Sequence, residues 1–249
     1  MARKLEAVIA AAERVLRTWE PVWTPFLDGA LLEEALEKLA GLAELDLASR
    51  GGYPGAERQR LLLQRHDVAI NANEVAAGLM GLELVGNFLF DPAERQDFRA
   101  GLLGLGAAEG GLGDLWLRGD RGAQVILTTA QAGALDGRTA MVRTVEVALE
   151  ARPLDQLQLP APRLPRRFHT VEASLRLDAV ASAGFGISRS RMAELIRQGH
   201  VRLNWLPAGS PSRQLAAGDR VQLEGRGELQ VEAVACTKRE RWRIELVRC

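Results

Sequence analysis

The segment Gly186–Trp205, GISRSRMAELIRQGHVRLNW, places arginines where a helix is expected to begin. Ser188 is a typical N-cap residue, because its hydroxyl can accept a hydrogen bond from an N–H group of the first turn. Apolar residues then recur at helical spacing, and Gly199 is expected to end the helix. Arg189 and Arg191 thus lie at the positive end of the helix dipole, where each cation costs about 0.3–1 kcal/mol. A helix start that gathers positive charge and N–H groups suits an anion, and phosphate is the first candidate.

The charges of the chain support a polyanion as the partner. The chain holds 32 basic and 32 acidic side chains, but they are unevenly distributed. Residues 163–249 contain 16 Arg or Lys against 9 Asp or Glu, whereas residues 1–162 contain 16 against 23. This split of +7 and −7 indicates a basic module attached to an acidic body. The alternative is a chance difference between two solvated surfaces.

Other kinds of site find little support. Cys236 and Cys249 form no CxxC motif, and the three histidines lack metal spacing. We therefore predict no disulfide framework, no metal and no cofactor. Cys236 is expected to be a buried strand residue. No GxxxxGK phosphate loop, GxSxG elbow or HExxH motif occurs, so the sequence favours a protein that is not an enzyme.

The sequence also predicts where the protein acts. No apolar run approaches the ~18 residues of a membrane-spanning helix. The N-terminal segment has charged residues where a signal peptide has an uncharged centre. We therefore expect a cytoplasmic protein with no membrane partner. The sequence does not decide the oligomeric state, and a monomer is favoured.

The elements that must position the arginines fall into three predicted parts of an α+β, multidomain fold. Residues 1–75 are predicted to form a helical N-terminal domain because apolar residues recur at helical spacing, with a helix or strand near its end. Residues 76–160 are predicted to form a ferredoxin-like α/β domain, since the expected elements follow the order β-α-β-β-α-β. Residues 168–249 hold the basic module. Prolines at 153–165 predict an extended linker, or alternatively an edge of the middle domain.

Three local patterns lie in the middle domain. Leu82–Phe90 alternates like a strand, with Phe88 and Phe90 on one face. Asp91 is expected to cap the next helix, with Pro92 as its first residue. Residues 140–154 are predicted to form one final strand.

Five motifs of the C-terminal part occur in a fixed order over about fifty residues. They are RLD (Arg176–Asp178), SRSR (Ser188–Arg191), AELIRQGHVRLN (Ala193–Asn204), PS (Pro211–Ser212) and GDRVQL (Gly218–Leu223). In this order and spacing they resemble the RNA-binding domain first described in the fourth small-subunit ribosomal protein, the S-four (S4) domain. The resemblance implies two helices packed on a small, mainly antiparallel sheet, and binding of structured RNA.

The resemblance extends to the rest of the chain. GGYPGAERQRLLL (Gly51–Leu63), GNFLFDPAERQDFRAGLLGLG (Gly86–Gly106) and LGDL (Leu112–Leu115) are similar to the YlmH family of bacterial, cyanobacterial and plastid proteins. One branch of that family is labelled "photosystem II S4 domain protein". The resemblance implies a central domain similar to an RNA-recognition motif and association with ribosomal RNA or tRNA on the ribosome, with the large subunit favoured.

The resemblance also implies which residues bind RNA. They come from the starts of two helices and from the strand and loop that follow: Arg176, Ser188, Ser190, Arg189, Arg191, Arg197, His200, Arg202, Asn204, Trp205 and Ser212. Asp178 is expected to cap a helix or to fix an arginine, because a carboxylate repels phosphate. Many S4 domains have glycine where this chain has Trp205, so the hairpin there is expected to differ. Trp205 either stacks on a base or packs against the helices.

We interpret the chain as a non-catalytic RNA-binding protein that acts in translation, ribosome assembly or rescue. An RNA-modifying enzyme of the pseudouridine synthase or methyltransferase type is one alternative, because S4 domains are often attached to such enzymes. A photosystem-related assembly factor is the other.

Overall fold

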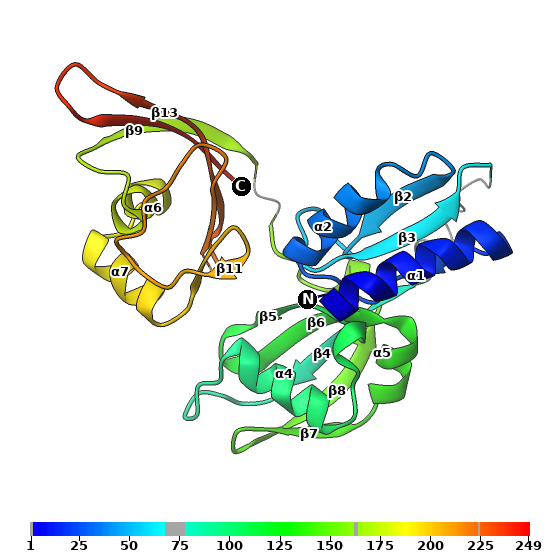
Figure 1. Cartoon of the computed structure of the whole chain (residues 1–249). Coiled ribbons are helices and arrows are strands. Elements are labelled where there is room, and N and C mark those ends of the chain that lie inside the picture. Colours follow the sequence, from blue (N-terminus) through cyan, green and yellow to red (C-terminus); the bar gives the residue numbers. More distant parts are fainter. Residues whose placement is uncertain (1, 68–77, 162–163, 224) are drawn as a thin grey trace. The chain divides into compact units, whose positions relative to one another are not determined.

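The computed structural model describes residues 2–67, 78–161, 164–223 and 225–249. Contacts divide the chain into two compact units, the first ending at residue 161 and the second starting at residue 162. Figure 1 shows the elements of both units in sequence colours. The predicted boundary between residues 75 and 76 lies outside the described residues, so the division into three domains stays a prediction.

The N-terminal part of the first unit packs two helices on a three-stranded antiparallel sheet of order β1-β3-β2. Its elements are α1 (Ala2–Thr18), β1 (Val22–Trp23), α2 (Gly29–Leu39), β2 (Leu45–Arg50) and β3 (Arg60–Arg65). The prediction of a helical region is therefore wrong at β1 and β2, whereas β3 lies near the end of the region, where the sequence left a helix or a strand open. Leu61, Leu62 and Leu63 are all buried in β3, and so short an apolar run has no periodicity that separates a strand from a helix.

The middle part of the first unit is a five-stranded antiparallel sheet of order β5-β6-β4-β8-β7, with both helices on one face (Figure 1). Its strands are β4 (Leu79–Val85), β5 (Leu112–Leu117), β6 (Gly122–Thr128), β7 (Thr139–Val142) and β8 (Val145–Arg152). Its helices are α4 (Arg95–Gly104) and α5 (Thr129–Leu135), with short 3-10 turns η1 (Glu109–Gly111), η2 (Gly119–Arg121) and η3 (Leu154–Gln156). The core lies between the sheet and the helices.

Strand β4 is shorter than predicted. It ends at Val85, and the chain then turns, with the N–H of Phe88 donating to the carbonyl of Asp120 at 2.8 Å. Phe88 is buried, whereas Phe90 is 92% exposed. The prediction of both phenylalanines on one strand face is therefore wrong, because the strand ends before either of them.

Asp91 does not cap the following helix. The N-cap of α4 is Glu94, in a capping box with Asp97. Asp91 instead accepts hydrogen bonds from Arg143 Nε at 2.7 Å and Thr144 Oγ1 at 2.6 Å. These two residues form the turn between β7 and β8, so the predicted single final strand is a hairpin. Arg143 has a φ of 53° there, a conformation that ends a strand.

The N-terminal and middle parts of the first unit are joined through Asp114 of β5. Its carboxylate accepts hydrogen bonds from Tyr53 Oη at 2.7 Å, Glu57 N at 2.7 Å and Arg58 N at 2.9 Å. Burial, followed by the charge of Asp114, raises the pKa of Tyr53, so the phenol stays a donor at neutral pH. The segment GGYPGAER is thereby held against the middle sheet.

A small apolar cluster joins the same two parts. It contains Phe26, Trp116, Ile126 and Leu157. Trp116 Nε1 donates to the carbonyl of Gln158 at 3.1 Å. The segment after β8 therefore packs against the rest of the first unit. This agrees with the alternative prediction, in which the prolines lie in an edge of the middle domain. The prediction of an extended linker is wrong for this segment.

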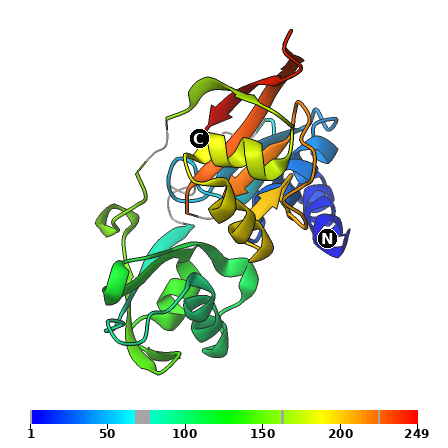
Figure 2. The same cartoon turned by 90° about the vertical axis from the view of Figure 1, so that its left-hand side faces the viewer.

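The second unit is a six-stranded antiparallel sheet of order β11-β10-β12-β13-β14-β9 with two helices on one face (Figures 1 and 2). Its elements are β9 (Arg166–Glu172), α6 (Leu177–Phe185), α7 (Arg189–Arg197), β10 (Val201–Leu203), β11 (Leu206–Pro207), β12 (Arg220–Leu223), β13 (Gly227–Cys236) and β14 (Trp242–Arg248). This agrees with the predicted two helices on a small antiparallel sheet.

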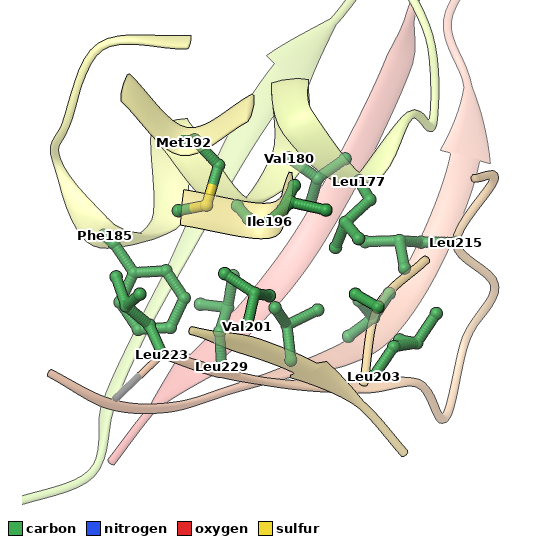
Figure 3. Close-up of a cluster of buried hydrophobic side chains, with 14 of the residues drawn as sticks. Leu177, Val180, Phe185, Met192, Ile196, Val201, Leu203, Leu215, Leu223 and Leu229 are labelled. Carbon is green, nitrogen blue, oxygen red and sulfur yellow. The ribbon is translucent and has the colours of Figure 1, made fainter. Parts of the chain in front are cut away.

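The core of the second unit lies between the helices and the sheet. Figure 3 shows Val180 of α6 and Ile196 of α7 directed towards Val201 and Leu229 of the strands. Cys236, at the end of β13, is exposed. The prediction that it is buried is wrong, because the core does not extend to the end of that strand.

Candidate nucleic-acid interface

The start of α6 is closed by a neighbouring loop. Leu177 N donates to the carbonyl of Arg213 at 2.7 Å, and Asp178 N donates to the carbonyl of Pro211 at 3.0 Å. These N–H groups are therefore engaged with protein oxygens. What α6 can offer to an anion is its side chains, in particular Arg176 at the N-cap.

Asp178 holds two arginines at once. Its carboxylate accepts from Arg176 Nε and Nη2, both at 3.1 Å, and from Arg189 Nε and Nη2 at 3.1 and 3.2 Å. The Asp178 side chain is only 7% exposed, whereas those of Arg176 and Arg189 are 36% and 53% exposed. The expectation that Asp178 fixes an arginine is confirmed, and it fixes one from each helix.

The electrostatics of this cluster favour the ionised carboxylate. Burial by itself would raise the pKa of Asp178, but the hydrogen bonds from Arg176 and then Arg189 outweigh it, so the pKa is lowered. The same bond raises the pKa of Arg176. The cluster therefore carries two positive charges and one negative charge, and it holds two guanidinium groups in fixed orientations. Such preorganised forks suit the oxygens of phosphate.

The first turn of α7 has the predicted cap. Ser188 Oγ accepts from Arg191 N at 3.3 Å and lies 3.2 Å from Ser190 Oγ. Arg191 Nη1 donates to Glu194 Oε2 at 2.7 Å, and both side chains are at least half exposed. An exposed pair of this kind contributes only about 0.3–0.5 kcal/mol, so Arg191 can exchange it for a phosphate.

The predicted residues do not all lie on one face. Arg197 is exposed in the last turn of α7, roughly 12 Å along the axis from Arg189 at 1.5 Å per residue. Arg202 is exposed between Val201 and Leu203, which are buried against the helices. Because side chains alternate along a strand, Arg202 points to the sheet face opposite α6 and α7. The half-buried His200 lies between these positions, directly before β10.

The hairpin after β10 keeps a two-residue loop. Leu203 pairs with Leu206, and Asn204 and Trp205 have φ values of 49° and 69°. The expectation that Trp205 changes the hairpin is wrong, since both loop residues adopt the left-handed conformation that such turns require. Asn204 holds the turn: its Nδ2 donates to Asp219 Oδ1 at 2.7 Å, and its Oδ1 accepts from Arg220 N at 2.8 Å.

Ser212 lies in the loop that closes the start of α6. Its N–H donates to Ser210 Oγ at 3.3 Å, and the two hydroxyls are 2.9 Å apart. Ser212 is exposed, and it lies between Pro211 and Arg213, whose carbonyls accept the hydrogen bonds from the first N–H groups of α6. Sequence reasoning missed Arg213, which is exposed in the same loop; its position next to the PS motif was the only available signal.

The sheet face of the middle part that points away from its helices is covered at β5 and β6. Ile126 and Gln124 of β6 alternate with core residues and so point away from α4 and α5, yet both are buried. Ile126 and Trp116 are covered by Phe26 and Leu157. RNA-recognition motifs stack bases on this face of the sheet, and here other parts of the chain occupy it.

Two further findings concern only the part of the chain that the structure describes. It contains no group of three His, Cys, Asp or Glu side chains that could hold a metal ion. None of its helices is both long and apolar enough to cross a membrane.

Comparisons with known proteins agree with these observations. Residues 2–68 match the family described as "YlmH, N-terminal", and residues 175–221 match the one described as "S4 domain". The chain is 27% identical over 226 residues, 90% of this chain and 86% of the relative, to the Bacillus subtilis "Ribosome-associated protein quality control protein P2". The solved structure of "Cell division protein ylmH from Streptococcus pneumoniae" has a TM-score of 0.52 at 19% identity, over 62% of this chain and 92% of that one. This last likeness shows the fold alone.

Proposed function

The chain is a YlmH-like protein with a YlmH N-terminal domain and an S4 domain, and on this basis we propose that it is a non-catalytic RNA-binding protein that acts on the ribosome. The ligand is structured RNA, either ribosomal RNA or tRNA, and the large subunit is the favoured partner. The process is translation, ribosome assembly or rescue. The protein acts in the cytoplasm, where ribosomes are.

The observation that carries the proposal is the arrangement of Arg176 and Arg189 around Asp178. Two guanidinium groups from different helices are held together at the surface, next to the first turn of α7 with Arg191. This supports contact with the phosphate backbone, because the guanidinium groups are held in place for oxygen acceptors. RNA shape would then decide where the unit binds.

The ribosome is proposed from the Bacillus subtilis relative, which is named as ribosome-associated and as a quality-control protein. Among translation, ribosome assembly and ribosome rescue, that name favours rescue. The absence of catalytic motifs from the sequence supports a role without catalysis. A photosystem-linked role finds no supporting observation in the structure.

The middle part is proposed to be ferredoxin-like. The order β4-α4-β5-β6-α5-β8, with β4 and β6 central, supports this, and β7 adds a strand at the edge. Because its sheet face is covered at β5 and β6, we propose that this part orients the protein on the ribosome rather than stacking bases. The three predicted domains, residues 1–75, 76–160 and 168–249, remain part of the proposal.

The experiment is sedimentation of tagged full-length protein from cell lysate through a sucrose gradient. The test variant is Arg191→Glu with Arg197→Glu, because both side chains are exposed and neither holds Asp178. Arg189→Glu is avoided, since it would place a second carboxylate beside Asp178. The matched control is Arg14→Glu with Arg17→Glu, an equal charge change on the exposed side of α1.

We expect the wild type and the control in a ribosomal subunit peak and the test variant at the top of the gradient. Wild-type protein that stays at the top would refute the ribosomal part of the proposal. A test variant that sediments like the wild type would refute the role of the α7 arginines.

A further inference from the structure

The turn between β13 and β14 is a fixed, basic projection. We call residues 237–241, TKRER, the basic turn. Thr237 N donates to the carbonyl of Arg241 at 2.7 Å, Glu240 N to the carbonyl of Thr237 at 3.0 Å, and Arg241 N to Thr237 Oγ1 at 3.1 Å. Glu240 adopts a φ of 54° to close it. The exposed Lys238 and Arg239 are therefore presented on an ordered backbone.

The charges of the basic turn differ from those on the neighbouring sheet face. Three arginines of that face lie near glutamates: Arg167 and Glu232 at 2.9 Å, Arg220 and Glu228 at 3.9 Å, and Arg243 and Glu245 at 4.0 Å. Arg202 points to the same face. In the described parts of the chain, Lys238, Arg239 and Arg241 form no ion pair, and the turn contains one carboxylate, Glu240. The charge of the sheet face is thus partly neutralised by these glutamates, whereas the turn keeps net positive charge.

The basic turn extends past the core of its unit. Ile244 is the last fully buried residue of β14 towards the turn. Trp242 is still partly buried against the core, so the turn begins directly after the edge of the core. Ala233 and Ala235 on the adjoining stretch of β13 are small and exposed. Figures 1 and 2 show this end of the hairpin away from α6 and α7. A slim projection of this shape can reach a ligand that the helices do not contact.

We propose that the basic turn is a second RNA-binding site, which contacts the phosphate backbone separately from the interface at α7. The inference rests on the proposed function, because it extends the RNA contact of the same unit. Lysine and arginine side chains on an ordered turn are suited to phosphate oxygens, and the Thr237 hydroxyl is engaged within the turn, where it accepts from Arg241 N. RNA is favoured over an acidic protein because the turn presents only charged side chains around Thr237, without an apolar anchor.

The test measures binding of full-length protein to a fluorescently labelled RNA hairpin with a long A-form stem, by anisotropy over a series of salt concentrations. The turn variant is Lys238→Gln, Arg239→Gln and Arg241→Gln. The control is Arg3→Gln, Arg14→Gln and Arg17→Gln, which removes the same charge from exposed positions of α1. Arg191→Gln with Arg197→Gln reports on the α7 interface. Circular dichroism confirms that all the proteins are folded.

We expect the turn variant to bind the RNA at least about ten-fold more weakly at low salt. The slope of log affinity against log salt concentration should also be shallower, by about 0.7–0.9 for each phosphate that the turn no longer neutralises. The control should match the wild type. A turn variant with wild-type affinity and slope, beside a weakened α7 variant, would overturn this inference and leave the proposed function standing. Equal losses in the turn variant and the control would also overturn it, since net charge alone would explain them. Absence of binding by the wild type would overturn both.

Discussion

Asp178 shows how one residue organises the candidate interface. An aspartate in an RNA-binding motif is unexpected, because its charge opposes phosphate. Its carboxylate instead orients Arg176 and Arg189, and the two guanidinium groups lower its pKa. The sequence indicated that this residue caps a helix or fixes an arginine, but not that it joins the two helices.

Replacing Asp178 is predicted to loosen the start of α6. Asp178→Asn should destabilise the second unit by about 1–3 kcal/mol at neutral pH, because a neutral amide cannot accept from two guanidinium groups as a carboxylate does. The measurement is hydrogen exchange of the α6 amides by mass spectrometry. Glu194→Gln, which removes the exposed pair with Arg191, is the matched control and should change exchange little.

The pH dependence of that effect follows from the lowered pKa. The pKa of Asp178 is lower in the folded protein than the ~3.9 of an unfolded aspartate. Its stabilising contribution is therefore complete above about pH 5 and is lost as the pH falls through the folded pKa. The difference between wild type and Asp178→Asn should shrink in acid. A difference that stays constant down to pH 3 would show that the carboxylate charge is not its cause.

At the scale of elements, α6 lies very close to the sheet. A Cβ on Gly184 would lie 2.3 Å from Leu229 Cδ2 and 2.8 Å from Cδ1. Leu229 is fully buried, so it cannot move away without disturbing the core. The close approach of α6 also sets where Arg176 and Asp178 meet α7.

Gly184→Ala is predicted to destabilise the second unit by about 1–3 kcal/mol through overpacking. Gly133→Ala in α5 is the matched control, because an added Cβ there meets nothing within 4 Å. That change should instead stabilise by about 0.5–1 kcal/mol, as expected for alanine in place of glycine in a helix. Urea unfolding followed by circular dichroism measures both changes. Similar effects of the two substitutions would contradict the close packing of α6.

At the scale of the whole molecule, contacts divide the chain into two compact units, and the three domains stay a prediction. The N-terminal and middle parts share the Asp114 hydrogen bonds and the cluster around Trp116. Neither contact has a local signal, since the partners of Asp114 are more than 50 residues away in sequence.

Asp114→Ala is predicted to release the segment 51–58 from the middle sheet. Three donors lose their acceptor, at a cost of about 1–3 kcal/mol for each donor left buried. Limited proteolysis should then cleave within that segment, where the wild type resists. Asp155→Ala, at an exposed position of the same unit, is the control and should leave the cleavage pattern unchanged. If Asp114→Ala resists proteolysis within this segment as well as the wild type does, Asp114 does not hold the segment against the middle sheet.

The sequence by itself determined the features that depend on neighbouring residues. The cap at Ser188 and the helix end at Gly199 follow from patterns within a few residues of one another. Capping, periodicity and turn formation act over that range, so sequence reasoning can detect them. The resemblance of the S4 motifs rests on the same kind of local pattern. The basic charge of the C-terminal part follows from composition alone.

Only the tertiary structure decided which of these residues meet. Asp178 and Arg189 come from different helices, and Arg202 faces away from both because Val201 and Leu203 must be buried. Ile126 of the middle sheet is covered by Phe26 and Leu157, which are both more than 30 residues away from it in sequence. Such contacts depend on how whole helices and strands pack against one another, and that packing is decided by many buried residues together. No single stretch of sequence therefore encodes them.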